Sequence, residues 1–239
     1  MLIIDNLRVT VEEKEVLKWV HMQFAVGKNY CLLGKNGSGK SSLALTVMGH
    51  PKYEITEGQI LLDGTSLKEI PPHERAKLGI FLAFQSIPEI KGVKLFEFLR
   101  TIYSAKVGEQ ITFLAFKKVV EPLIAELAID RDFLRRDLNV GFSGGERRKI
   151  EILQLRLLEP KYIFLDEVDS WLDVDAFRSV AGLMKEVNTD QNTFIIITHY
   201  FSVLDYIPVD HVYVLENGKI TQEGDVSIAY AIKEKGFGE

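Results

Sequence analysis

One short glycine-rich stretch constrains the fold of this chain more than any other. Residues 34–41 read Gly-Lys-Asn-Gly-Ser-Gly-Lys-Ser, after the apolar run at 30–33 and before the helix-like run at 42–48. A strand, a glycine loop and a helix in this order are the context that a phosphate-binding P-loop requires. The alternative is a surface turn that matches the pattern by chance. The flanking strand and helix favour the P-loop, so the sequence predicts a nucleotide-binding α/β protein.

The residue types in this loop suit the binding of phosphate groups and Mg²⁺. Glycines let successive backbone N–H groups point at phosphate oxygens, and the positive end of the following helix faces the same anion. Lys40 is expected to reach the β- and γ-phosphates, and the Ser41 hydroxyl is expected to bind Mg²⁺. The residues expected to contact the nucleotide here are Gly34, Lys35, Asn36, Gly37, Ser38, Gly39, Lys40, Ser41 and Ser42.

Composition narrows the class of protein. The 239 residues are 46% hydrophobic and 26% charged, as in ordinary globular proteins, and the net charge of −5 disfavours a nucleic-acid binder. No apolar run approaches the ~18 residues that span a bilayer, and the start of the chain lacks a secretory signal pattern. A single cysteine, Cys31, excludes an internal disulfide. We therefore expect a cytoplasmic protein without direct membrane insertion.

Short β-like runs surround the loop. Those at 2–4, 7–11 and 21–26 are closely spaced before any helix, which predicts antiparallel pairing. A further strand is expected at 58–64. Asn217-Gly218 separates two alternating runs and predicts a hairpin near the end of the chain.

The middle of the chain combines a strand-end glutamine with helical sequence. Gln85 follows the apolar run at 80–84, at the kind of position where open α/β sheets bind ligands. It could bind a metal and sense the γ-phosphate, although an exposed glutamine at a strand end is the simpler interpretation. Apolar residues then recur at helical spacing at Phe116, Val120, Leu123 and Leu127. These predict core-facing helix positions.

Two further strands end in chemically useful residues. The run at 161–165 leads to Asp166, suited to hold Mg²⁺, and to Glu167, suited to polarise a water for attack on the γ-phosphate. The run at 193–198 leads to His199, a candidate γ-phosphate contact, although lone histidines are usually structural.

A second glycine-rich element lies at residues 141–149. Ser143 and Glu146 have the spacing of a helix capping box, so local sequence predicts at least a well-capped helix. Gly144 and Gly145 beside that serine also offer bare N–H groups to an anion. From these residues alone, the element could be either a purely structural helix cap or a contact with a phosphate.

Taken in order, these motifs resemble the ATP-binding cassette (ABC) family over nearly the whole chain. Residues 142–146 resemble its LSGGQ signature, in which Phe142 and Glu146 replace the leucine and glutamine at the two ends. The resemblance implies a P-loop NTPase fold: a RecA-like mixed sheet core, an N-terminal antiparallel β-subdomain and an inserted helical subdomain. We expect a single domain over 1–239, with the helical subdomain at about 86–158.

The same resemblance implies the chemistry. The chain is expected to bind and hydrolyse ATP with Mg²⁺. Two copies are expected to pack head to tail when ATP binds, so that the signature of one copy completes the nucleotide site at the P-loop of the other. The signature residues expected to contact the nucleotide are Ser143, Gly144 and Gly145. The expected catalytic residues are Glu167, His199 and Gln85, and the expected metal ligands are Ser41, Gln85 and Asp166.

Within the family, the chain is most similar to the ATPases of the Suf iron–sulfur cluster assembly machinery. The similarity is carried by residues 79–85, 88–93, 139–146, 198–200 and 204–207. It implies an ATPase that drives conformational change in a scaffold of SufB/SufD-like subunits, bound through the segment from Ser86 to about Arg100. Two alternatives remain: the cytosolic ATPase subunit of an ABC membrane transporter, and a nucleotide-gated binding subunit with little turnover.

Two positions depart from the family pattern. Trp171 replaces a small residue of the D-loop, where it would either anchor the interface between two copies or obstruct its closure. Val11 occupies the position at which many members stack an aromatic ring on adenine. The base would then have apolar contact only, and the affinity for ATP should be modest.

Overall fold

The computed structural model describes residues 1–168, 174–198 and 201–237, which belong to two compact units. The first unit comprises Met1–Phe84 and the described parts of Pro160–Asp169 and Asn188–Glu239. The second comprises Gln85–Glu159 and helix α6 (Val174–Val187). Each unit has its own sheet or helix packing and is described by itself.

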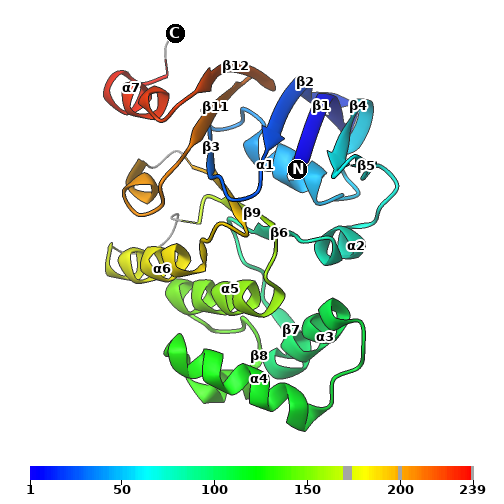
Figure 1. Ribbon diagram of the computed structural model, residues 1–239, viewed down its shortest axis with the longest axis vertical. Coiled ribbons are helices and arrows are strands. Elements are labelled where there is room, and N and C mark those ends of the chain that lie inside the picture. The colour runs from blue at the N-terminus through cyan, green and yellow to red at the C-terminus, as the bar shows by residue number, and fades with distance from the viewer. Residues whose placement is uncertain (169–173, 199–200, 238–239) are drawn as a thin grey trace. The chain divides into compact units, whose positions relative to one another are not determined.

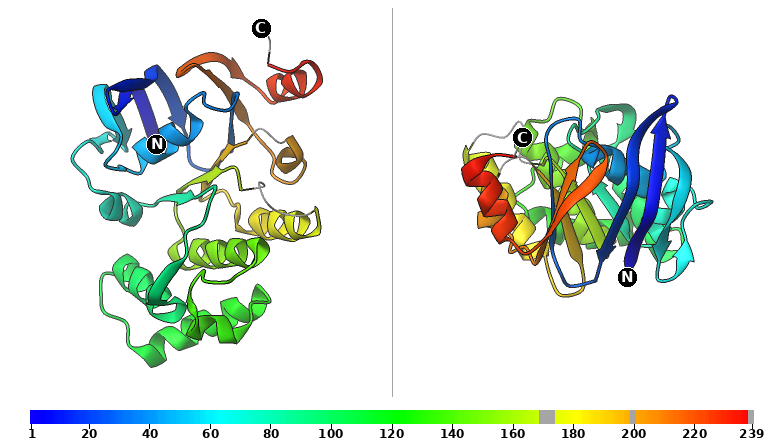
Figure 2. Two further views of the ribbon diagram at one scale, coloured as in Figure 1. Left: turned by 180° about the vertical axis from the view of Figure 1, so that it is seen from behind. Right: turned by 90° about the horizontal axis from the view of Figure 1, so that it is seen from above.

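An antiparallel sheet forms the start of the first unit. Its order is β2–β1–β4–β5, with bounds Lys14–Phe24, Leu2–Val11, Glu54–Leu62 and Thr65–Ser66. In both views of Figure 2, β1 and β2 lie side by side, and the pairing is antiparallel throughout. Alternate residues of β1, including Leu2, Ile4 and Val9, are buried, as expected for a sheet with one face on the core. The predicted antiparallel subdomain is confirmed.

A second, mixed sheet holds the strands that carry the motifs. Its order is β12–β11–β3–β10–β9–β6, with bounds Lys219–Gly224, His211–Glu216, Tyr30–Leu33, Thr193–Ile197, Tyr162–Asp166 and Ile80–Ala83. Figure 1 labels each of these strands except β10. All neighbours pair in parallel except β12, which forms the predicted hairpin with β11. Every residue of β3, β9 and β10 is buried, as in parallel strands covered on both faces.

The described residues of this unit form four helical segments: α1 (Lys40–Val47), α2 (Pro72–Lys77), η2 (Phe201–Asp205) and α7 (Ser227–Lys235). The core between the two sheets contains Phe24, whose ring meets the rings of Tyr30, Phe164 and Tyr213 edge-on at centroid distances of 5.0–6.1 Å. Edge-to-face packing of this kind adds to the burial of the rings themselves. This core connects the strand before the glycine loop to β9 and β11.

The second unit is mainly helical. Its helices are α3 (Leu95–Val107), α4 (Phe113–Glu126), η1 (Arg131–Arg135), α5 (Gly144–Leu158) and α6. Phe116 and Val120, on the predicted apolar stripe of α4, are buried, and Phe116 packs against Phe96 of α3. Along the residues that the structure describes, no helix combines the length and apolar character needed to cross a bilayer.

A small sheet in this unit was not expected. Strand β7 (Ile90–Lys94) pairs with the two-residue β8 (Asp137–Leu138). Asp137 fixes the pairing, because its carboxylate accepts a hydrogen bond from the Gly92 N–H at 3.0 Å and forms an ion pair with Lys94 at 2.7 Å. Every residue of β7 is exposed, so the strand lacks the apolar alternation from which strands are predicted.

Candidate functional site

The glycine loop has the predicted strand–loop–helix context. β3 ends at Leu33, and α1 begins at Lys40 with Gly39 as its N-cap. Gly39 has φ 110°, a conformation that glycine adopts without strain. At Gly34 a Cβ atom would collide with the Leu215 carbonyl oxygen and the Ser38 hydroxyl. The loop backbone therefore depends on glycine at both positions.

Lys40 lies inside this loop. Its side chain is 5% exposed, and Nζ donates to the carbonyl oxygens of Gly34 at 2.7 Å and Lys35 at 3.2 Å. Burial lowers the pKa of the Lys40 ammonium, while the charges of Glu167 and Asp166 oppose the shift. A buried cation surrounded by main-chain polar groups is suited to an anionic ligand.

The sheet register brings the two carboxylates to the edge where this loop lies. Asp166, the last residue of β9, is level with Ile197 of β10, and Ile197 is level with Leu32 of β3. The Ser41 hydroxyl at the start of α1 donates to the Asp166 carboxylate at 3.0 Å. Hydroxyl and carboxylate oxygens are the ligands that Mg²⁺ prefers, so the pair fits this ion.

Glu167 directly follows β9 and is also buried. Its backbone has φ 46°, which is uncommon for a residue other than glycine, and its N–H donates to the Ile197 carbonyl at 2.8 Å. This bond fixes the turn after Asp166. Strained backbone of this type concentrates at functional sites.

The other predicted residues lie in different places. Val11 ends β1 and is partly buried. Gln85 belongs to the second unit and is exposed there. His199 and Trp171 lie outside the described residues. The structure therefore brings together Lys40, Ser41, Asp166 and Glu167 of the predicted set, which lie in the first unit.

The signature-like element caps a helix in the second unit. Ser143 is the N-cap of α5, its hydroxyl accepts from the Glu146 N–H at 3.3 Å, and the Glu146 carboxylate accepts from the Ser143 N–H at 2.7 Å. The capping box predicted from the spacing is present. Ser143 and Gly144 are exposed, so this end of α5 is accessible to a second molecule.

Sequence reasoning missed an arginine that supports the glycine-loop helix. Arg75 of α2 is buried, and its guanidinium donates to Thr46 and Val47 carbonyls at 2.9 and 2.8 Å, at the end of α1. It also donates to the Ile70 and Leu67 carbonyls at 2.7 and 2.6 Å. Burial lowers the pKa of Arg75. The polar sequence of α2 predicts a surface helix and gives no signal for this role.

Comparison with known proteins decides the family. A family model described as "ABC transporter" matches residues 17–170. The chain belongs to the ABC transporter family. It is 40% identical to the "Probable ATP-dependent transporter ycf16" of Cyanidium caldarium, over 99% of this chain and 95% of that protein. It is 42% identical to the "Probable ATP-dependent transporter slr0075" of Synechocystis sp., over 99% and 94%.

The fold agrees with this family. A solved structure of the ATP-binding cassette MJ0796 superposes with a TM-score of 0.79 at 20% identity, covering 95% of this chain and 99% of that one. The predicted ABC-type P-loop NTPase fold is therefore confirmed. As a member of this family the chain is an ABC ATPase, which binds ATP with Mg²⁺ and hydrolyses it.

Proposed function

We propose that this ABC ATPase is the SufC-type subunit of an iron–sulfur cluster assembly scaffold, in which ATP hydrolysis drives a conformational change. The observation that carries the proposal is the sequence from Gly79 to Val93, whose similarity to Suf ATPases extends beyond the shared nucleotide motifs. Residues 1–239 would form one domain with a helical subdomain at about 86–158. A cytoplasmic location remains a prediction from the sequence.

Exposed apolar side chains support a partner at this segment. Ile90 and Val93 of β7 are 40% and 38% exposed. They lie within the segment from Ser86 to about Arg100, which we propose to bind SufB/SufD-like subunits. Apolar side chains next to charged ones, here Lys91 and Lys94, are typical of a docking surface with a polar rim.

In the proposed mechanism, the P-loop holds the triphosphate. Backbone N–H groups of residues 34–42 and the start of α1 face the phosphates, and Lys40 neutralises charge on the β- and γ-phosphates. Ser41 and Asp166 would hold Mg²⁺, together with Gln85. An ion held there would supply positive charge to offset the negative charge that develops on the phosphates. Val11 would give adenine an apolar contact.

Glu167 is the proposed residue that orients the attacking water. Its carboxylate lies beside the metal-binding Asp166 in sequence and near Lys40, whose pKa it influences. His199 and Gln85 are proposed to contact the γ-phosphate and complete the catalytic set. Phosphoryl transfer depends mainly on positioning and charge, so an incomplete set should turn over slowly.

A second copy is proposed to complete each site. Ser143, Gly144 and Gly145 would contact the γ-phosphate held at the P-loop of the other copy. The exposure of Ser143 and Gly144 at the start of a fifteen-residue helix supports this role, since such N–H groups bind anions. The cassette MJ0796 has been solved as a dimer bound to ADP and Pi.

The second candidate is the ATPase subunit of a membrane transporter. The printed names of the algal and cyanobacterial relatives, "Probable ATP-dependent transporter", favour it. Both candidates use the same nucleotide chemistry and differ in the partner. The nucleotide-gated binding subunit is motivated by Trp171 in the D-loop, and the presence of the catalytic pair Glu167 and His199 in the sequence argues against it.

Co-purification separates the two candidates. The tagged full-length chain is isolated with detergent from its own cells, and bound proteins are identified. We expect water-soluble scaffold subunits, and we expect Val93→Glu to abolish their recovery because a charge would be buried in the interface. Val107→Glu is the matched control, since Val107 of α3 is 42% exposed and lies outside the proposed segment. Recovery of integral membrane proteins instead would contradict the Suf assignment.

A further inference from the structure

Arg147 connects two segments that the mechanism treats separately. It lies on the first turn of α5, four residues after Ser143. Its Nε donates to the Phe142 carbonyl, in the signature, at 3.0 Å. Its two terminal nitrogens donate to the Ile87 carbonyl at 3.4 Å and to the Glu89 carboxylate at 2.5 Å. One guanidinium thus links two stretches of chain. One is the loop at 139–143 that leads into the signature, called the signature loop below, and the other is the segment after Gln85.

Neighbouring contacts make the same connection. The Asn139 side chain, buried before the signature, donates to the Pro88 carbonyl at 3.0 Å. Arg148 donates to the Gln85 carbonyl at 3.2 Å. Residues 85, 87, 88 and 89 are therefore each bonded to residues 139–148. Residues 85–89, which precede β7, form no helix or strand of their own, so these bonds set the course of this stretch.

The signature loop is fixed from its other side as well. The Phe142 ring stacks on Phe133 at a centroid distance of 4.4 Å, and the Arg136 guanidinium lies over Phe142 at 4.6 Å. Arg136 also donates to the Val140 and Gly141 carbonyls at 3.0 and 3.1 Å. Arg147 joins the segment at 87–89 to this rigid group.

We propose that Arg147 is a positioning residue: it makes the signature loop and the segment at 85–89 move as one body, so that Ser143 is held where a second copy's nucleotide meets it. This inference rests on the proposed role of Ser143 and adds the residue that controls its placement. A partner bound at the segment after Gln85 would act on Ser143 through the same guanidinium.

The planar guanidinium is essential to this role. Its donors form a rigid fork that reaches three acceptors at once, whereas a lysine ammonium is a single point charge on a flexible stem. A lysine could retain the attraction to Glu89 but could not also bridge the Phe142 and Ile87 carbonyls. Geometry, and not charge alone, should therefore decide activity.

The test compares the full-length chain with Arg147→Met and Arg147→Lys. Steady-state ATPase measurements give kcat and KM, and a fluorescent ATP analogue gives the affinity of the single chain. We expect both substitutions to lower kcat about tenfold or more, since misplacement by ~1 Å can cost a hundredfold. Single-chain affinity should change less than about twofold because the P-loop remains unaltered.

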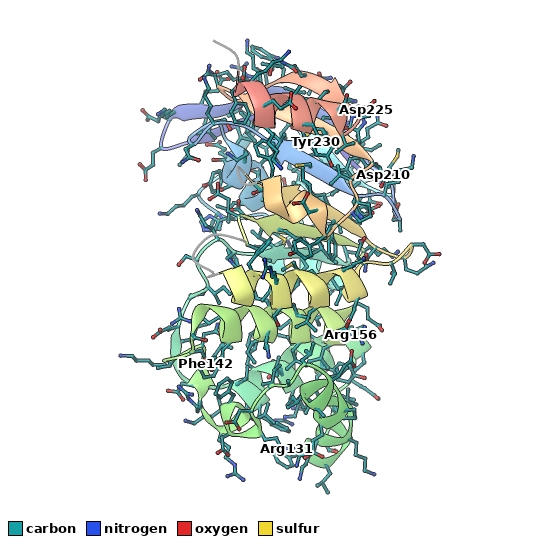
Figure 3. The ribbon with its side chains drawn as sticks, turned by 90° about the vertical axis from the view of Figure 1, so that its left-hand side faces the viewer. Arg131, Phe142, Arg156, Asp210, Asp225 and Tyr230 are labelled. Atoms are coloured by element: carbon teal, nitrogen blue, oxygen red, sulfur yellow. The ribbon has the colours of Figure 1, made fainter. Side chains whose placement is uncertain are left out.

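Arg156→Met is the matched control. Arg156 is on the same helix and forms an ion pair with Glu126, and its side chain is 33% exposed against 26% for Arg147. It lies toward the opposite end of α5 from Phe142 (Figure 3). We expect its kcat within about twofold of wild type, as exposed ion pairs contribute little.

Hydrogen exchange supplies the second readout. Loss of Arg147 should increase exchange at 87–92 and at 140–145 together, whereas Arg156→Met should leave both unchanged. Unchanged exchange, kcat equal to that of the control, or full rescue by Arg147→Lys would overturn the inference.

Ser143→Ala distinguishes failure of the positioning role of Arg147 from failure of the proposed role of Ser143. If Ser143→Ala leaves kcat unchanged, the proposed role of the signature fails. If it lowers kcat while the Arg147 variants do not, only the positioning role fails.

Discussion

At the scale of single residues, the P-loop lysine is placed for its ligand at a cost to folding. Lys40 is almost fully buried, and burial lowers the pKa of its ammonium. Nearby Asp166 and Glu167 and two backbone carbonyls offset part of that cost. A side chain selected for stability alone would be apolar here. The arrangement is expected where an anion supplies the missing interaction.

Lys40→Met should therefore separate activity from stability. We expect kcat to fall by about a hundredfold or more, because charge stabilisation on the phosphates is lost. The free energy of unfolding without nucleotide should change little, because removal of a desolvated cation offsets the loss of its hydrogen bonds to the Gly34 and Lys35 carbonyls. ATPase assays and urea denaturation measure the two effects. Lys28→Met, at an exposed position before β3, is the control.

The pH dependence of this comparison has a definite sign. The pKa of Lys40 is lowered in the folded protein from 10.5, so between its folded pKa and 10.5 the unfolded chain binds more protons. The free energy of unfolding of the wild type should then rise with pH relative to that of Lys40→Met in that window.

The activity prediction has its own contradicting result. Turnover of Lys40→Met within twofold of wild type would show that the nucleotide site is not at Lys40.

At the scale of elements, the end of α1 depends on a residue from another helix. Arg75 donates to two carbonyls at the C-terminus of α1 and to two more in the loop before α2. Helix C-terminal carbonyls have no partner within the helix, and a cation there is favourable. The helix that begins at the glycine loop is thus fixed at its far end by α2.

Arg75→Met should destabilise the protein by about 3 kcal/mol or more, because the Val47 and Ile70 carbonyls lose their guanidinium donor and the Thr46 and Leu67 carbonyls keep only a backbone N–H. Urea denaturation followed by circular dichroism gives the free energy of unfolding. Lys77→Met on the same helix is the control, and its exposed ion pair with Glu74 should contribute less than about 1 kcal/mol. Equal effects of both substitutions would exclude the bracing role of Arg75.

Sequence patterns predicted the elements that have local signals. The glycine loop, the capping box at Ser143 and the hairpin at Asn217-Gly218 each depend on residues close in the chain. The β7–β8 sheet and the contacts of Arg75 and Arg147 depend on residues far apart in sequence, and their side chains look like ordinary surface charges. Such interactions cannot be inferred from spacing.

At the scale of the whole molecule, the family and the fold followed from the order of motifs. Residues 17–170 match the family, and the parallel strands place Asp166 level with Leu32 at the edge that carries the glycine loop. The partner does not follow from these shared motifs, because transporter and scaffold ATPases use the same nucleotide chemistry. We propose that it depends on the exposed segment after Gln85, where Ile90 and Val93 lie.

The central claim is that each nucleotide binds between the P-loop of one copy and the signature of another. The most direct measurement is a crystal structure of the full-length chain with Mg²⁺ and a nonhydrolysable ATP analogue. The account predicts a two-copy assembly in which the Ser143 hydroxyl lies within hydrogen-bonding distance of the γ-phosphate held at Lys40 of the other copy. An analogue bound away from Lys40, or a closed assembly in which Ser143 does not approach the neighbouring nucleotide, would contradict it.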